Sequence, residues 1–346
     1  MTDIGTSAID QVFKDLLIDD EWSTRDERAF SWIGHRLKQT VTAGKLFDDD
    51  GIVLSRLTAS TVVAKEVEAS EEDVFRHLAR LNRHAIGSAY SYDPVEREIR
   101  STAIAYVHDE TAAWRSQQMG VFTILQLCIA EGEADYIAHK CNGSLAVEAH
   151  PSNGLRRVRD DMLNVLDTNI AKEGSGPSRY IDKFEFDAIA EMTKQTDKLA
   201  SLGGSESGVA IETPFGDFTS LTFVATDEPH RRAGSGLVVR LHLPTKASPD
   251  EADRICAVLN RAEHSAYSAA THYGAWCWDE WPNVGRAITY KLFVPNAVYR
   301  QGISQDAACS MAKRAIWVEG FLNAEHASGS AWDILAERFG FSRGED

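Results

Sequence analysis

Apolar residues recur along the chain with two different periods, which predict a mixture of helices and strands. Apolar positions three or four residues apart predict helices at 25–42, 70–83, 111–139 with a break near Gly120, 183–198, 248–261 and 304–327, and a short amphipathic helix within 1–20. Runs rich in β-branched and aromatic residues predict strands at 51–57, 61–67, 101–107, 209–213, 218–225, 237–243 and 287–293. This combination predicts an α+β fold.

Part of this pattern occurs twice, which indicates a duplicated module. Residues 70–83 align without gaps on residues 248–261, and both segments predict a helix with a serine N-cap and acidic residues in its first turn. The second segment adds Pro249 at the first helical position. The identical positions are Ser70/Ser248, Arg76/Arg254, Ala79/Ala257, Leu81/Leu259, Asn82/Asn260 and Arg83/Arg261.

The elements that flank these two helices repeat as well. Each module is predicted to run α-β-β-(β)-α-β-β-α, with an antiparallel sheet and helices packed on it. Residues 174–178, which are rich in glycine, serine and proline, form the predicted linker, and residues 203–208 are expected to join a helix to a strand. We therefore expect an N-terminal extension helix at 1–20, a first module at 21–174 and a second at 175–346, each with its own core.

Composition narrows the functional classes. The net charge of −16 argues against general nucleic-acid binding, and no apolar run reaches the ~18 residues of a membrane span. The first 20 residues carry five aspartates and lack the basic and apolar regions of a secretory signal. Five cysteines without a CxxC pair indicate a reducing, cytoplasmic location and predict neither a disulfide framework nor a metal site. No cofactor-binding motif is present, so no cofactor is expected.

The densest cluster of notable residues is the aromatic segment 273–283. Trp276 and Trp278 are predicted to share one face of a strand, with Cys277 on the other. One interpretation places these rings in the core. The other makes them an exposed protein-binding patch, because tryptophan and tyrosine are enriched at interface hot spots. The residues of this protein-binding hypothesis are Tyr273, Trp276, Trp278 and Trp281, with Trp114 and Tyr299 as weaker members.

Catalytic interpretations find little support in the sequence. Asp279 and Glu280 are adjacent, so on an extended strand their carboxylates point apart. The sequence therefore predicts a protein that is not an enzyme. One alternative is an enzyme with a site between the modules, built from His272, Cys277, Asp279 and Glu280. The other is an obligate structural subunit of a larger complex. The shared Leu-Asn-Arg at the end of each middle helix is interpreted as structural.

The Ser-capped helix that ends in Leu-Asn-Arg, between strand pairs and before a long helix, resembles the type III secretion chaperone and YbjN-like fold of the Tir-chaperone-like superfamily. The second copy, with residues 259–261, 273–277 and 293–296, is similar to tandem members of unassigned function in actinobacteria. The resemblance implies an acidic chaperone or adaptor that holds an extended segment of a client protein. It also implies that the two modules form an intramolecular pseudo-dimer, and it leaves homo-oligomerisation open.

Overall fold

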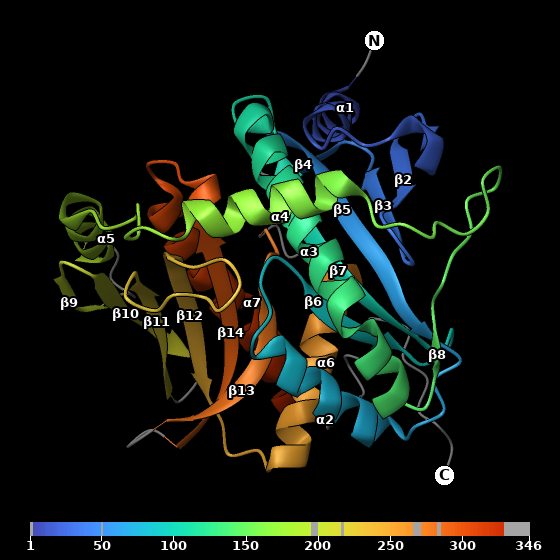
Figure 1. Cartoon of the computed structure of the whole chain (residues 1–346). Coiled ribbons are helices and arrows are strands. Elements are labelled where there is room, and N and C mark those ends of the chain that lie inside the picture. Colours follow the sequence, from blue (N-terminus) through green and yellow to red (C-terminus); the bar gives the residue numbers. More distant parts are fainter. Residues whose placement is uncertain are drawn as a thin grey trace.

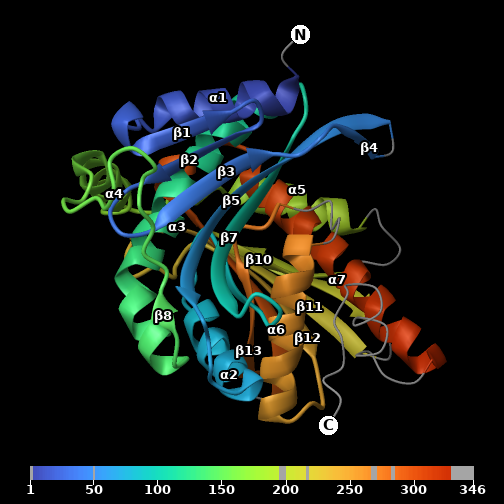
Figure 2. The same ribbon diagram turned by 90° about the vertical axis from the view of Figure 1, so that its right-hand side faces the viewer.

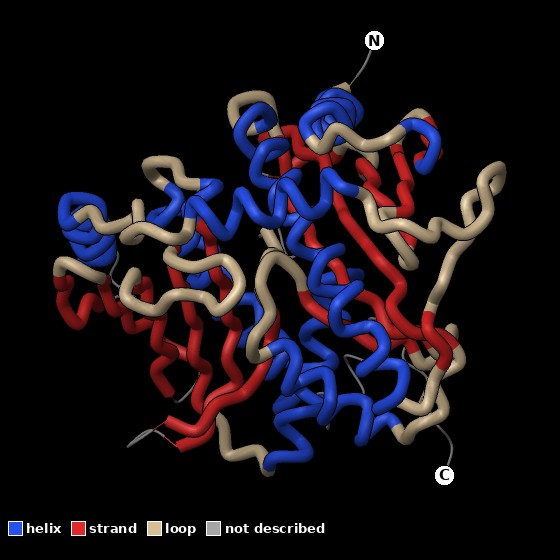
Figure 3. The backbone as a smooth tube through the Cα atoms, in the orientation of Figure 1, coloured by secondary structure: helices blue, strands red, loops and turns tan. Residues whose placement is uncertain are grey.

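The computed structural model describes residues 3–49, 51–194, 200–215, 218–265, 271–281 and 285–328. These residues form seven α-helices and two antiparallel sheets, which confirms the predicted α+β class. In Figure 1 the two sheets lie on opposite sides of a group of helices, and in Figure 3 the strands fall into two corresponding groups.

The first half of the chain forms a sheet with the strand order β1-β2-β3-β5-β7-β6, with β4 and β8 paired to β5. Helix α3 packs on β5 and β7, and α1 packs on α3 and on the strands β3 and β5. The elements are α1 (Ile4–Asp15), β1 (Ser23–Asp26), β2 (Ala29–Ile33), β3 (Lys38–Ala43), β4 (Phe47–Asp49), β5 (Ile52–Lys65), α2 (Glu71–Asn82), β6 (Ala89–Asp93), β7 (Glu98–Val107), α3 (Ala112–Lys140) and β8 (Ser144–Leu145).

The second half forms a sheet with the strand order β9-β10-β11-β12-β14-β13. Helix α7 packs on β10, β11 and β12, while α6 packs on β13. Its elements are α5 (Lys183–Lys194), β9 (Ala200–Ser205), β10 (Gly208–Phe215), β11 (Phe218–Ala225), β12 (Gly236–Pro244), α6 (Pro249–Ser265), β13 (Ala275–Trp281), β14 (Gly285–Pro295) and α7 (Ile303–Ser328). Helix α4 (Asp161–Glu173) connects the halves and lies across α3 (Figure 1).

Both halves therefore have a similar order: a helix, a run of strands, a middle helix, a hairpin and a long helix. Five strands precede the middle helix in the first half and four in the second. The predicted caps are present, because Ser70 Oγ accepts from the Asp73 amide and Ser248 Oγ from the Glu251 amide. Ser248 and Glu251 form a reciprocal capping box, in which the glutamate accepts from the Ser248 amide. Helix α3 is continuous through Gly120, so the expected break is absent.

The prediction of a helix at residues 25–42 is wrong, since this segment forms β1, β2 and β3. Phe30, Ile33 and Leu37 have helical spacing, but the exposed and buried positions alternate along β3, as they do in a strand. Pairing of β3 with β5 decides the conformation, and β5 itself is one strand where two were predicted. Residues 203 and 204 lie within β9, not in a helix-to-strand joint.

The apolar core is continuous between the halves. Buried residues from both sheets and from the helices that cover them belong to one cluster, so the expectation of two separate cores is wrong. Figure 2 shows α2 and α6 side by side where the two sheets approach each other. The contact between α2 and α6, with the hairpins beside them, is the junction between the two halves.

The shared asparagine performs the same structural task in both halves. Asn82 Nδ2 donates to the Tyr90 carbonyl oxygen at 3.0 Å, and its Oδ1 accepts from the Tyr90 amide at 2.8 Å. Asn260 binds the Trp276 carbonyl and amide in the same way, with both distances 2.8 Å. Each asparagine is 1% exposed. Each therefore ties the end of a middle helix to the first strand of the following hairpin.

Replacing either asparagine with alanine is expected to lower the free energy of unfolding by ~2–4 kcal/mol. The physical reason is that a buried amide and a buried carbonyl each lose their partner, at ~1–3 kcal/mol per group. Urea unfolding of Asn82→Ala and Asn260→Ala measures the loss. The matched control is Asn164→Ala, at an exposed position of α4, with an expected change within ~0.5 kcal/mol. A loss below ~1 kcal/mol at either buried site would contradict this assignment.

Candidate functional site

Two ion pairs cross the junction between the halves, and each half supplies the arginine of one pair and the aspartate of the other. Arg83 Nε lies 3.1 Å from Asp279 Oδ1, and Arg261 Nη2 lies 3.8 Å from Asp93 Oδ1. The two arginines are equivalent in the repeat, and each aspartate follows an asparagine-bound residue, Tyr90 or Trp276, by three positions. Each half therefore gives an arginine to the other half and receives one.

A second reciprocal set joins the N-terminal parts of the two middle helices. Arg76 lies 3.6 Å from Asp250, and Arg254 lies 3.5 Å from Glu72. In the repeat, Glu72 is equivalent to Asp250, since each lies two positions after the N-cap serine. Helices α2 and α6 pack against each other, and each also contacts the hairpin of the opposite half. Such mutual contacts are typical of a two-fold interface.

A buried polar cluster lies beneath α6 on the second-half side of the junction. Glu263 and Arg314 are each 1% exposed, and the Arg314 Nε lies 2.8 Å from Glu263 Oε1. Trp276 Nε1 donates to the same carboxylate oxygen at 3.2 Å, and the Arg314 guanidinium lies 4.0 Å from the centroid of the Tyr290 ring. Removing one member of a buried ion pair leaves an uncompensated charge, so this cluster constrains the packing around it.

Two histidines at the edge of this cluster are held neutral. His272 Nδ1 is 3.1 Å from the Tyr290 hydroxyl, and His264 Nδ1 is 2.9 Å from Ser91 Oγ in the first half. Burial lowers the pKa of both rings well below the usual value near 6.5. Arg314 lowers the pKa of His272 further, and His272 lowers that of His264. His272 also exchanges two backbone hydrogen bonds with Ile104, which joins the halves directly.

The residues of the catalytic alternative occupy separate environments. His272 belongs to the buried cluster, and burial raises the pKa of the Cys277 thiol to about 12, so the thiolate is scarce near neutral pH. Asp279 pairs with Arg83, and Glu280 lies 3.2 Å from Arg286. His272, Cys277, Asp279 and Glu280, all of them within the described part of the chain, share no hydrogen bond or ion pair.

Two members of the aromatic hypothesis cannot belong to an exposed patch. Trp276 and Tyr273 are 0% and 2% exposed. The Trp276 ring packs at 5.2 Å against Tyr290 under α6, and the Tyr273 ring packs at 4.0 Å against Phe122 of the first half. Because α6 and α3 cover these rings, the core interpretation holds for both residues. Cys277 is buried as well, on the other face of β13.

The other members of the aromatic hypothesis are half-buried or lie outside the description. Trp278 Nε1 donates to Asp253 at 2.6 Å, and its ring lies beside the guanidinium groups of Arg83 and Arg286. The side chain of Trp281 lies outside the described residues. Trp114 and Tyr299 remain partly accessible and contact arginine side chains, Trp114 those of Arg115 and Arg300, and Tyr299 that of Arg179.

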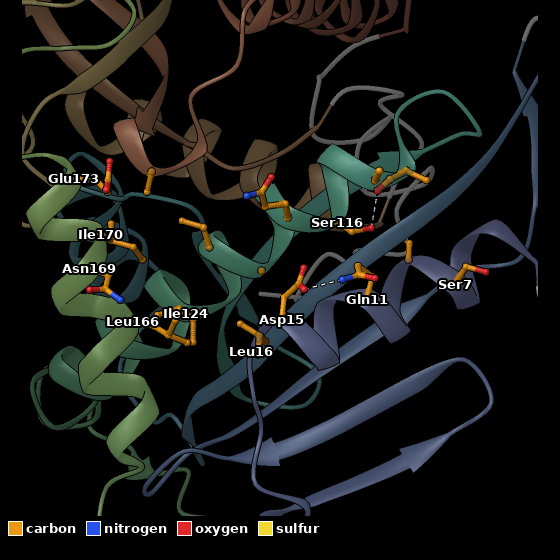
Figure 4. Close-up of a pocket in the computed structure, with 17 residues that line it drawn as sticks. Ser7, Gln11, Asp15, Leu16, Ser116, Ile124, Leu166, Asn169, Ile170 and Glu173 are labelled. Atoms are coloured by element: carbon orange, nitrogen blue, oxygen red, sulfur yellow. Dashed lines mark hydrogen bonds between the residues drawn. The ribbon is translucent and has the colours of Figure 1, made fainter.

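An apolar groove of about 760 Å³ lies between α1, α3 and α4 (Figure 4). Leu16, Ile124, Leu166 and Ile170 supply its larger apolar surface. Small residues of α1 and α3 leave the space open, namely Ser7, Ala8, Ala112, Ala113, Ser116 and Gly120.

Two polar side chains of the groove form hydrogen bonds within the protein. Gln11 Nε2 donates to Asp15 Oδ1 at 2.7 Å, and Ser116 Oγ donates to the Ala112 carbonyl at 2.6 Å (Figure 4). The charged side chains that line the groove, Asp15 and Glu173, are both acidic. The groove therefore offers apolar contact with a negative margin.

The sequence interpretation did not identify this groove. The signal was the spacing of Ala113, Ser116, Gly120 and Ile124, which places small and apolar residues on one side of a long helix. Trp114 and Tyr299, which were singled out, are close in sequence to the lining residues Ala113 and Ala297 but do not line the groove.

Comparisons with known proteins give no relative for this chain: no family model matches, and neither a curated protein nor a solved structure matches significantly. Among the described residues, no helix has the length and hydropathy to cross a membrane. The same residues include no cluster of three or more histidines, cysteines or acids arranged to hold a metal ion. The site is therefore interpreted from its geometry.

The buried histidines predict a loss of stability in mild acid. A ring whose pKa is lowered by folding stays neutral in the folded state but is protonated in the unfolded state below pH ~6.5, so unfolding takes up protons. Stability is therefore retained above pH ~6.5 and falls below it, by at most about 1.4 kcal/mol per pH unit for each such histidine. Urea unfolding between pH 7.5 and 5 is the measurement, above the main titration of the carboxylates.

The variant His272→Gln is expected to reduce this slope by about one proton. His139→Gln, at an exposed position of α3, is the matched control and is expected to leave the slope unchanged. A slope that is the same in the wild type and in His272→Gln would contradict the assignment of His272 as a buried neutral ring.

Proposed function

We propose that this protein is a non-catalytic, protein-binding chaperone or adaptor of the tandem secretion-chaperone-like type. Its two halves act as a pseudo-dimer within one chain. The reciprocal pairs Arg83–Asp279 and Arg261–Asp93 support the pseudo-dimer, together with the similar element order of the halves. The observation that carries the binding function is the apolar groove between α1, α3 and α4.

The walls of the groove favour a helical segment of the client. All three long walls are helices, so the groove itself offers no sheet edge to which an extended segment could add a strand. The small side chains of Ala8, Ala113 and Gly120 allow a helix axis to approach closely, since interaxial distances depend on side-chain size at the contact.

Charge complementarity selects the flanks of the bound segment. Asp15 and Glu173 are acidic, and the whole chain carries a net charge of −16. A client helix with an apolar face and lysine or arginine at its ends is therefore attracted to this surface, whereas an acidic helix is repelled. Apolar contact supplies the affinity, and the charges supply the selectivity.

Site-specific photo-cross-linking in a lysate of the native host tests this function. A photoreactive phenylalanine derivative replaces Gln117, which lines the groove, or Lys172, an exposed α4 position outside it. Cross-linking at position 117 is expected to recover a segment with apolar residues at helical spacing and basic flanks. Position 172 is expected to give at least about tenfold less product.

A pair of alanine variants provides the control for the groove itself. Ala113→Trp places a large ring inside the groove and is expected to reduce cross-linking from position 117 at least about tenfold. Ala171→Trp makes the same change at an exposed α4 position outside the groove, and is expected to have no effect. Equal labelling at positions 117 and 172, or recovery of acidic segments without apolar periodicity, would overturn the proposal.

A further inference from the structure

A second pocket, of about 740 Å³, lies between the two halves on the side of the junction formed by α2, α3 and the loop between β11 and β12. The first half contributes residues of α2 and α3, and the second contributes the loop at 228–232 and residues of β12 and β14. Its volume is within the ~300–1,000 Å³ that is usual for small-molecule sites. It shares no residue with the apolar groove.

The pocket is basic although the protein is acidic. Arg80, Arg231, Arg232 and Lys291 line it, against two acids, Glu133 and Glu228. Glu228 accepts two hydrogen bonds from Arg240. Burial raises the pKa of Glu133, while Tyr90, Arg232 and Arg231 lower it, so this carboxyl faces two arginines of the pocket.

Among the described residues, three of the four cations in the pocket form no ion pair. Arg232 is neutralised by Asp167, which accepts two hydrogen bonds from it, at 3.1 and 2.8 Å. Within the described part of the chain, Arg80 and Arg231 make no hydrogen bond or ion pair. Lys291 Nζ reaches only the carbonyl oxygen of Arg83, at 3.4 Å. The four cations that line the pocket outnumber its two acids, so its local charge is positive.

Strand pairing adds to this excess of positive charge. Lys291 on β14 lies directly opposite Arg240 on β12, and like charges in opposed positions destabilise a strand pair. Glu228 accepts hydrogen bonds from Arg240, and among the described residues Lys291 itself forms no ion pair. Burial, together with Arg240, lowers the pKa of Lys291 by more than Glu228 and Asp279 raise it. A bound anion would remove both penalties.

The loop at 228–235 is held in place before any ligand binds. His230 Nδ1 accepts from the Arg232 amide, and its Nε2 faces the His84 carbonyl of the first half at 3.3 Å. The Gly174 carbonyl accepts from the Ser235 amide at 2.8 Å, and Gly234 packs so closely on Gly174 that an added Cβ would lie 2.2 Å from that carbonyl oxygen. These contacts fix the backbone beside Arg231, and preorganisation lowers the cost of binding.

We propose that this pocket binds a small organic phosphate, with its phosphate groups at Arg80, Arg231 and Lys291. Arginine forks match phosphate oxygens in bidentate geometry, and three cations that form no ion pair among the described residues favour an anion with more than one charge. Leu81, Ile129 and Phe293 line the same pocket and provide apolar contact for the organic part. The ligand touches both halves, so its binding stabilises their association.

Isothermal titration calorimetry with inorganic pyrophosphate and with ADP tests the proposal on the full chain. Both are expected to bind, ADP more tightly because of its base, and both more weakly as ionic strength rises. Arg80→Gln and Arg231→Gln are each expected to weaken binding about tenfold, which corresponds to the loss of one charged hydrogen-bonding group. Both residues are exposed and form no hydrogen bond or ion pair with the described residues, so the fold is expected to persist, and circular dichroism checks this.

Arg157→Gln is the matched control, since Arg157 is an exposed arginine away from the pocket. It is expected to bind pyrophosphate as the wild type does. Absence of binding heat with both probes would overturn the proposal, as would equal weakening by Arg157→Gln and Arg231→Gln. A polyglutamate peptide that binds more tightly than ADP would also overturn it, since the pocket would then accept an acidic protein segment.

Discussion

The packing of α2 against α6 is the contact on which the rest of this structure depends. Each middle helix covers the hairpin of its own half and also contacts the hairpin of the other half. The apolar core is therefore continuous, and the buried pair Glu263–Arg314 lies beside the junction. Since removal of one partner from such a pair costs several kcal/mol, the second half tolerates little rearrangement there. This contact sets the positions of the residues of the basic pocket and of the reciprocal arginine pairs.

Local signals made part of the fold predictable from sequence. Serine N-caps, acidic first turns and apolar spacing identify α2 and α6 because those signals act within one or two turns of a helix. The segment at 25–42 shows the limit. Phe30, Ile33 and Leu37 satisfy helical spacing, yet β3 forms because it pairs with β5, a partner more distant in sequence. Periodicity cannot register such a contact, so tertiary pairing overrides the local pattern.

The candidate sites were harder to predict, for two different reasons. Tyr273 and Trp276 have the side chains expected at an interface, but helices from elsewhere in the chain cover them, and composition alone does not reveal what covers a residue. The apolar groove was missed for a different reason. It exists because Ala113, Ser116 and Gly120 have small side chains that leave space on one face of α3, and small residues are inconspicuous in a sequence.

The two surfaces differ in charge in a way that separates their ligands. The groove has acidic margins in a chain of net charge −16, while the pocket between the halves is lined by more cations than acids. The overall negative charge does little to offset those cations, because screening limits exposed charges to a range of ~8 Å at physiological ionic strength. Only an anion close to the pocket can therefore balance its positive charge. Residues from both halves supply the cations, so an anion in this pocket acts across the junction and favours the paired arrangement of α2 and α6.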